Sequence, residues 1–278
     1  MTAPRAVLLA LPCLVLTLAC DPAAPGRAPA SGDGPDRDAA WWQPAPGTSW
    51  QWQLTETVDT SVQVDAFDID LFEAPDDVIA TLHEQGRTVV CYFSAGTHED
   101  WRGDAEAFPA GAIGNPLPDW PGERWLDVRD AGVRTALAAR LDHAQARGCD
   151  AVEPDNVDGY ANDSGFDFDA GDQLAFNRWL ADEAHARGLS VGLKNDLEQA
   201  AALQPAFDWA LDEECMAFDE CDALQPFIDA GKAVFHVEYV DDAADADARA
   251  DEICDDANAR GFSSLIKTWD LNAFRRAC

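Results

Sequence analysis

The sequence predicts an α/β fold, a single (β/α)₈ TIM-like barrel at residues 41–278. Two observations lead to this prediction. Short apolar segments recur eight times, and the helical segments between them end at a glycine directly before the next apolar segment. Strands buried in a parallel sheet have near-continuous apolar sequences, and alternating strands and helices indicate such a sheet. Eight strands in one domain favour a closed barrel over the alternative, an open doubly wound sheet.

The predicted strands are rich in Val, Ile, Leu, Phe and Trp, and most of them end on polar side chains. They are Ser49–Leu54, Ala66–Phe72, Thr88–Ala95, Ala151–Asn156, Ser190–Asn195, Phe207–Glu213, Lys232–Tyr239 and Ser263–Trp269. The predicted helices are Asp76–Gln85, Val133–Arg147, Asp172–Arg187, Asp219–Ala230 and Asp247–Arg260. Glycine follows each helix directly, and we expect it to adopt the left-handed conformation that ends a helix.

The N-terminal region predicts export. Arg5 precedes an apolar run that is too short for a comfortable membrane span and that ends at Cys20. Residues 1–20 therefore resemble a bacterial lipoprotein signal peptide, with Cys20 as the lipidation site. Cleavage as an ordinary signal peptide is the alternative. Either way we expect a protein of the bacterial cell envelope or a secreted protein, in contact with a membrane only through a lipid anchor.

Residues 21–40 are rich in Pro, Ala, Gly and Asp and predict a flexible linker. The chain is strongly acidic, with 19 Lys and Arg against 52 Asp and Glu and a formal net charge of −33. Such a surface repels nucleic acid and anionic lipid and attracts polycations. Solubility or a high-salt habitat is the alternative explanation. We expect a monomer.

Cysteines after Cys20 are even in number, which predicts disulfides in an exported protein. Cys215 and Cys221 could close one loop, and Cys254 and Cys278 could attach the last helix. The sequence leaves the pairing of Cys91 and Cys149 open. No metal site or cofactor is expected, because no CxxC motif occurs and the five His are scattered.

The segment from Thr97 to Arg129 is long and irregular and contains Trp101, Trp120 and Trp125. Loops of this length in a folded domain are usually functional. It follows the third predicted strand, so we expect it on the face of the barrel where the strands end.

Polar side chains collect at the ends of the predicted strands, where barrel enzymes place their active sites. Buried carboxylates are costly without partners, so a set of them points to chemistry. Two carboxylates on either side of a bond are what glycoside hydrolysis requires, and aromatic rings stack on sugars. Individual carboxylates could instead cap helices or bind Ca²⁺. The set comprises Gln53, Asp68, Asp70, Tyr92, Ser94, Glu153, Asp155, Asn156, Lys194, Asn195, Asp212, Glu213, Glu238, Tyr239, Lys267 and Trp269.

The sequence resembles glycoside hydrolase family 114, the endo-α-1,4-polygalactosaminidases, over about Trp50–Tyr239. Together the matching motifs are highly specific. They are WQWQL at Trp50–Leu54, DAFDIDLF at Asp65–Phe72, VVCYFSAGTHEDWRGDAEAFP at Val89–Pro109, WPGERWLDVR at Trp120–Arg129, GCDAVEPDNVDGY at Gly148–Tyr160, GLSVGLKND at Gly188–Asp196, DEEC at Asp212–Cys215 and KAVFHVEY at Lys232–Tyr239.

The resemblance implies a TIM-like barrel that cleaves α-1,4-linked chains containing galactosamine, with Asp155 and Glu213 as the catalytic carboxylates. We expect Asp155 to act as nucleophile or base and Glu213 as general acid. A register shift of one would exchange Glu213 for Glu214. Sugar binding or tuning of the catalytic carboxyls is expected of Asp68, Asp70, Glu153, Asn156, Lys194, Asn195 and Glu238, and stacking of Tyr92, Trp101 and Tyr239.

Several alternatives remain open at this point. Glu153 could pair with Lys194 instead of contacting sugar. The protein could bind carbohydrate without cleaving it, or could hydrolyse a different glycan, because fold alone does not decide function. The acidic run from Asp241 to Asp251 could bind Ca²⁺ or simply begin a solvated helix.

Overall fold

The structure, a computed structural model, describes residues 41–278. The predicted signal peptide, the lipidation site Cys20 and the predicted linker lie outside these residues. No helix within 41–278 combines the length and the apolar composition that a membrane span requires.

The predicted parallel sheet is present. Within residues 41–278 the main sheet has nine strands, and the first eight run parallel to one another in chain order. They match the predicted strands and confirm the barrel. Their order is β1 (Trp50–Gln53), β2 (Ala66–Asp70), β3 (Thr88–Ser94), β7 (Ala151–Asp155), β8 (Ser190–Lys194), β9 (Trp209–Glu213), β10 (Val234–Val240), β11 (Ser263–Thr268) and β12 (Arg276–Ala277).

Large side chains fill the interior of the barrel. Trp50, Trp52, Trp209 and Phe235 are buried in one apolar cluster although they come from β1, β9 and β10. Gly192 on β8 leaves the space for Trp209, since a Cβ atom there would lie 2.3 Å from the indole ring. The interior is therefore a packed core below the strand ends.

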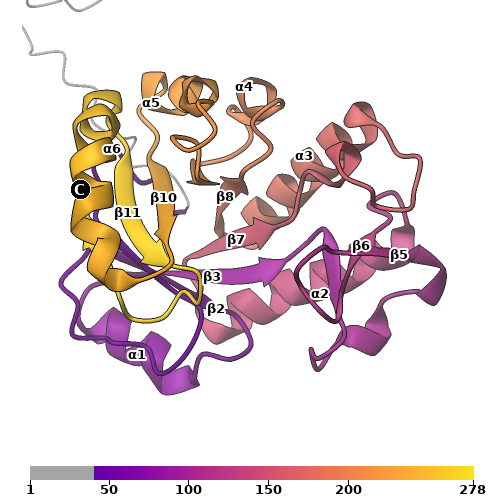
Figure 1. Cartoon of the computed structure of the whole chain (residues 1–278). Helices are drawn as coiled ribbons and strands as arrows, with labels where there is room; N and C mark the ends of the chain where they lie inside the picture. Colours follow the sequence, from indigo (N-terminus) through magenta and orange to yellow (C-terminus); the bar gives the residue numbers. More distant parts are fainter. Residues whose placement is uncertain (1–40) are drawn as a thin grey trace, which may run out of the picture. The chain divides into compact units, whose positions relative to one another are not determined.

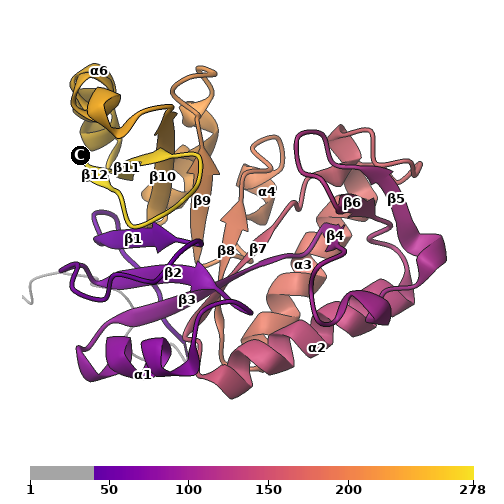
Figure 2. The same ribbon diagram turned by 60° about the horizontal axis from the view of Figure 1, so that its bottom comes forward.

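Helices cover the outside of the sheet, as Figures 1 and 2 show. The helices are α1 (Asp76–Glu84), α2 (Ala131–Arg147), α3 (Ala170–Ala186), α4 (Ala200–Leu203), α5 (Gln225–Asp229) and α6 (Ala246–Arg260), and short 3₁₀ turns are η3 (Gly159–Ala161), η4 (Cys221–Leu224) and η5 (Ala243–Asp245). The glycine after each predicted helix has a positive φ, which confirms the predicted helix ends. These glycines are Gly86, Gly148, Gly188, Gly231 and Gly261.

The predicted helix Asp219–Ala230 is wrong in its first half. Asp219 has a left-handed backbone (φ 58°), η4 follows it, and α5 begins only at Gln225. Pro226 stands in the first turn of α5, where its missing N–H costs nothing. Within a continuous helix from Asp219 the same proline would have removed a hydrogen bond.

The insert, which we define as residues 97–129, is more ordered than the irregular loop that was predicted. It forms an antiparallel sheet in the order β4 (Thr97–Glu99), β6 (Glu123–Leu126), β5 (Ile113–Pro116), together with η1 (Ala105–Ala107) and η2 (Ala110–Ala112). Both views place this sheet at the C-terminal end of β3 (Figures 1 and 2), which agrees with the predicted position.

The barrel closes between its first and last parallel strands without a strand ladder joining β1 to β11 in residues 41–278. The C-terminal segment, residues 271–277, bridges the two strands instead. It pairs with β11 through the antiparallel strand β12, and the Leu271 carbonyl accepts from the Leu54 amide at 3.0 Å. The Arg275 guanidinium donates to the Trp50 carbonyl at 3.1 Å.

Three disulfides join the six cysteines of the described region. Cys215–Cys221 and Cys254–Cys278 confirm the two predicted pairs. The third is Cys91–Cys149, which connects β3 to the turn before β7. The sequence leaves this pairing open because Cys91 and Cys149 lie in or beside apolar runs.

Candidate active site

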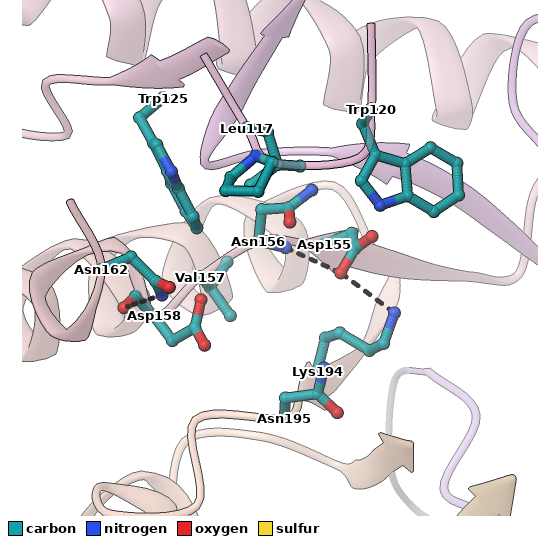
Figure 3. A pocket seen from close by; sticks show the side chains of 11 residues that line it. Leu117, Trp120, Trp125, Asp155, Asn156, Val157, Asp158, Asn162, Lys194 and Asn195 are labelled. Atoms are coloured by element: carbon teal, nitrogen blue, oxygen red, sulfur yellow. Dashed lines mark hydrogen bonds and ion pairs between the residues drawn. The ribbon is translucent and has the colours of Figure 1, made fainter. Parts of the chain in front are cut away.

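Lys194 at the end of β8 brings the two predicted catalytic carboxylates together. Its ammonium lies 3.0 Å from Asp155 Oδ1 and 3.1 Å from Glu213 Oε2, although β7 and β9 carry these residues on either side of β8. A third carboxylate, Glu153, lies 3.2 Å from the same nitrogen. Figure 3 shows the contact between Lys194 and Asp155. Glu153 thus pairs with Lys194, which was one of the two alternatives.

Neutral donors hold the other oxygens of the two carboxylates. The Tyr92 hydroxyl donates to Asp155 Oδ2 at 3.0 Å, and the Tyr239 hydroxyl donates to Glu213 Oε1. Burial, followed by the nearby carboxylates, raises the pKa of both tyrosines well above its usual value. Both phenols therefore keep their protons and act as donors.

Backbone and amide groups complete this arrangement. The Asn156 amide N–H donates to Asp155 Oδ1 at 2.8 Å. The Asn195 side chain donates to Glu213 Oε2 at 3.3 Å and accepts from the Glu213 amide at 3.0 Å. Asn156 and Asn195 both have left-handed backbones (φ 60° and 47°), which turn the chain sharply where each strand ends. The two carboxylates are thereby held in one orientation.

Glu153 and Asp68 lie beneath this pair, inside the barrel. Glu153 is fully buried and accepts from the Trp52 indole at 3.1 Å. Burial raises the pKa of Glu153 to about 7 against the opposing effect of Lys194. Burial and the charge of Glu153 raise the pKa of Asp68 well above its usual value. Both carboxyls therefore bind a proton more readily than exposed carboxyls do.

The strand ends open into a cavity of about 860 Å³. Of the twelve residues predicted for catalysis, sugar binding or stacking, nine line it, while Asp68, Glu153 and Glu238 do not. The lining comprises Trp52, Leu54, Thr55, Asp70, Glu73, Tyr92, Glu99, Trp101, Arg102, Leu117, Trp120, Glu123, Asp155, Asn156, Lys194, Asn195, Glu213, Glu214, Tyr239, Trp269, Asp270 and Leu271.

Asp70 and Glu238 have structural partners that the sequence did not indicate. Arg102 donates to both oxygens of Asp70, at 2.9 and 2.7 Å. Glu238 accepts from the Met216 amide at 2.9 Å, from Arg249 and from His236. Asp70 therefore anchors the insert at the cavity wall, and Glu238 supports the loop after β9 from behind.

The insert supplies residues that the strand-end rule missed. Arg102 also pairs with Glu99 at 2.8 Å, and both side chains are buried. Glu123 accepts hydrogen bonds from the Thr97 hydroxyl and from the side-chain amide of Asn156, the latter at 3.2 Å. Burial raises the pKa of Glu123 to about 7. The sequence signal available for these residues was the length of the insert and its tryptophans.

Glu213 and Glu214 both line the cavity, although strand alternation predicted that only one would point inward. Strand β9 ends at Glu213, and Glu214 has a left-handed backbone (φ 66°) beyond it. Alternation therefore no longer applies to Glu214. Only Glu213 reaches Lys194, which agrees with the predicted assignment.

Exposed aromatic rings surround the mouth of the cavity. Trp101, Trp120 and Trp269 are each more than half exposed. Trp269 stacks on Tyr239, with ring centroids 4.1 Å apart and planes inclined by 14°. Rings in these positions present flat apolar faces to a bound sugar.

A metal site is not formed by these residues. Among the described residues, Cys215, Cys221 and His236 are the one group close enough to share an ion, and the two cysteines are bonded to each other. The acidic run from Asp241 to Asp251 begins a helix, with the Asp242 side chain accepting from the Ala244 amide at 2.9 Å.

Comparison with known proteins agrees with this geometry. The model of glycoside-hydrolase family GH114 matches residues 33–278. The crystal structure of Aspergillus fumigatus Ega3 in complex with galactosamine is similar, with TM-score 0.81 and 43% identity over 85% of this chain and 97% of that chain. A search of curated proteins gave no match.

The glycoside hydrolase domain of PelA from Pseudomonas aeruginosa has the same fold, with TM-score 0.65 and 16% identity over 82% of this chain and 98% of that chain. The extent of the family match and the identity to Ega3 lead to one conclusion. The chain belongs to glycoside-hydrolase family GH114.

Proposed function

We propose that the protein is an exported glycoside hydrolase that cleaves α-1,4-linked polysaccharide containing galactosamine, with Asp155 and Glu213 as its catalytic carboxylates. The observation that carries the proposal is the contact of both carboxylates with Lys194 in the lining of a cavity that also has aromatic walls. The galactosamine bound to the related Ega3 supports an amino sugar as the substrate.

The spacing of the two carboxylates favours retention of configuration. Both contact one nitrogen atom, at 3.0 and 3.1 Å, so these two oxygens are at most about 6 Å apart. Retaining enzymes separate their carboxyl groups by about 5–5.5 Å, and inverting enzymes by about 6.5–9.5 Å.

In the retaining pathway Asp155 attacks the anomeric carbon while protonated Glu213 gives its proton to the departing glycosidic oxygen. The glycosidic bond breaks as the bond to Asp155 forms. Glu213 then takes a proton from water, and the resulting nucleophile releases the sugar from Asp155. Tyr92 and Asn156 orient Asp155 for the attack, and Tyr239 and Asn195 orient Glu213.

Product analysis on defined galactosamine oligomers tests this proposal. Asp155→Asn and Glu213→Gln should each lower kcat by roughly 10²–10⁴-fold, because each removes a proton-transfer or nucleophilic group. Asp182→Asn, an exposed carboxylate on α3, serves as the control. Folded wild-type protein that releases no product from acetylated or free-amine oligomers would contradict the activity. Full activity of both variants would contradict the assigned residues.

We further propose that residues 1–20 direct export and that Cys20 carries lipid. Three disulfides in the folded domain support an oxidising compartment. Metabolic labelling with a fatty-acid probe should mark the wild-type chain and not Cys20→Ala. Equal labelling of both would contradict lipidation at Cys20.

A further inference from the structure

A second, smaller chamber of about 210 Å³ lies beside Asp155. It shares six lining residues with the main cavity, so the two spaces are neighbours around the same carboxylate. Figure 3 shows Leu117, Trp120 and Trp125 along one side of it and Lys194 and Asn195 on the opposite side. Its remaining lining residues are Pro118, Asp155, Asn156, Val157, Asp158 and Asn162.

Asp158 is the carboxylate of this chamber that has no counter-ion. Within residues 41–278 no Lys, Arg or His lies within ion-pair distance of its oxygens. The only cation in the lining, Lys194, is already shared by Glu153, Asp155 and Glu213. Burial and the charge of Asp155 raise the pKa of Asp158, so a cation in the chamber would relieve an unfavourable environment.

The rest of the lining suits a sugar ring. Trp120 is 57% exposed and borders both spaces, which makes its indole face available for stacking. The Asn162 side-chain N–H donates to the backbone carbonyl of Asp158 at 3.2 Å. The Asn162 side-chain oxygen can still accept a hydrogen bond from a sugar hydroxyl. The chamber therefore combines one anionic group, hydrogen-bonding amides and an aromatic face.

We propose that this chamber is a binding subsite for one 2-amino-2-deoxy sugar unit of the substrate, adjacent to the unit attacked by Asp155. Asp158 pairs with the protonated amine of that unit, and Trp120 stacks on its ring. The proposal rests on the proposed hydrolase function and deepens it. It means that the polymer continues past Asp155 and that a free amine is preferred over an acetamide at this position.

Kinetics on two substrates test the subsite. Asp158→Asn should lower kcat/KM about tenfold on free-amine galactosamine tetramers and leave N-acetylated tetramers nearly unaffected, because only the former lose a charge-assisted hydrogen bond. Trp120→Ala should lower kcat/KM on both tetramers, because stacking on the indole does not depend on the amine. Asp163→Asn, an exposed carboxylate in the same loop, is the control for general electrostatic attraction. Equal losses on both tetramers, or no loss for Asp158→Asn, would overturn the subsite.

Binding separates this subsite from the hydrolase activity. Calorimetric titration of free-amine tetramer into Glu213→Gln protein, with and without Asp158→Asn, needs no turnover, and thermal unfolding checks that both variants fold. About tenfold weaker binding with Asp158→Asn supports the subsite, and unchanged binding overturns it. If wild-type protein cleaves the tetramer but Asp158→Asn leaves its binding unchanged, the subsite proposal is wrong and the hydrolase function stands. If nothing is cleaved, the function fails and this titration still decides the subsite.

Discussion

At the scale of single residues, one ammonium group organises the site. Lys194 contacts Glu153, Asp155 and Glu213, and Asp68 lies beside Glu153. One positive charge cannot neutralise four ionised carboxylates in a buried place. Burial, together with the neighbouring carboxylates, therefore raises the pKa of Glu153 and of Asp68.

Glu123 predicts how stability changes with pH. Burial raises its pKa to about 7, whereas a glutamate in an unfolded chain titrates near pH 4.3. The native state therefore binds the proton more tightly, and the stability it contributes is full below about pH 4.3 and is lost as pH rises towards 7. Glu123→Gln, which keeps an acceptor for Thr97, should flatten the fall of Tm between these pH values. The same fall of Tm with pH in Glu123→Gln and wild-type protein, measured by circular-dichroism melts, would contradict this.

The sequence predicted the centre of the site better than its edges. Asp155, Lys194 and Glu213 end neighbouring parallel strands, and the ends of such strands meet at one rim. Asp70 also ends a strand, but Arg102 from the insert occupies both its oxygens. Glu123 lies on no barrel strand. A strand-end position indicates where a side chain lies and does not indicate which partner reaches it.

At the scale of elements, Arg102 and Arg140 attach the insert to the barrel. Arg102 joins Asp70 of β2 to Glu99 of β4, and Arg140 of α2 joins Asp104 at 2.8 Å to the Ser94 carbonyl at 2.7 Å. Both guanidinium groups lie about 5 Å from the Phe72 ring centroid, at 5.0 and 5.1 Å. The insert is therefore held by buried ion pairs, whose loss leaves uncompensated charges.

Arg102→Met tests this attachment. It leaves Asp70 buried without its cation, and Glu99 keeps only the longer contact with Arg140 at 3.5 Å, so the free energy of unfolding should fall by about 3–5 kcal/mol. KM should also rise, because Trp101 and Glu123 belong to the same insert. Urea denaturation measures the first effect and steady-state kinetics the second. Arg124→Met, an exposed arginine of β6, is the matched control, and an equal loss there would contradict the explanation.

The disulfides should differ in their contribution to stability. Cys91–Cys149 spans 58 residues and Cys215–Cys221 spans 6. Loop-closure entropy gives about 4 kcal/mol for the first and about 2 kcal/mol for the second. Replacing each pair by alanines and measuring urea unfolding should give losses in this order. The reverse order would show that packing around the sulfurs outweighs the loop length.

Helix ends were predicted more accurately than helix continuity. Glycine is nearly alone in adopting positive φ without cost. Gly148 and Gly261 therefore fix the C-terminal ends of α2 and α6 through local backbone conformation. The segment Asp219–Ala230 has the composition of a helix, yet the Cys215–Cys221 link constrains its first residues. The sequence placed these two cysteines together without indicating that their loop would interrupt the helix.

At the scale of the whole molecule, the net charge of −33 predicts a salt dependence. With a free-amine polymer, kcat/KM should fall as ionic strength rises, because salt screens exposed charges over about 10 Å at 0.1 M. Fully N-acetylated oligomers carry no amine charge and should show little change. Rates measured on both substrates across a salt series check this. A salt-independent rate on the free-amine polymer would favour solubility or a saline habitat as the reason for the acidic surface.

The curled parallel sheet could be predicted from the sequence, and the way its first and last parallel strands are connected could not. Eight buried strands separated by helices favour a barrel in which the last strand pairs with the first. Instead residues 271–277 bridge β1 and β11. This segment has no apolar repeat, and its partners at the β1 edge are backbone groups more than 200 positions away, such as the Trp50 carbonyl that accepts from Arg275 (225 positions).

The bridging segment, residues 271–277, also protects the edges of β1 and β11 from pairing with strands of other molecules. Bare margins of β1 and β11 would offer rows of unpaired amides and carbonyls, which recruit strands from other chains. Residues 271–277 engage several of those groups, because β12 pairs with β11, the Leu271 carbonyl accepts from the Leu54 amide and Arg275 donates to the Trp50 carbonyl. The Cys254–Cys278 bond tethers the segment to α6. Reduction of this bond should therefore promote self-association of the protein before it lowers catalytic activity.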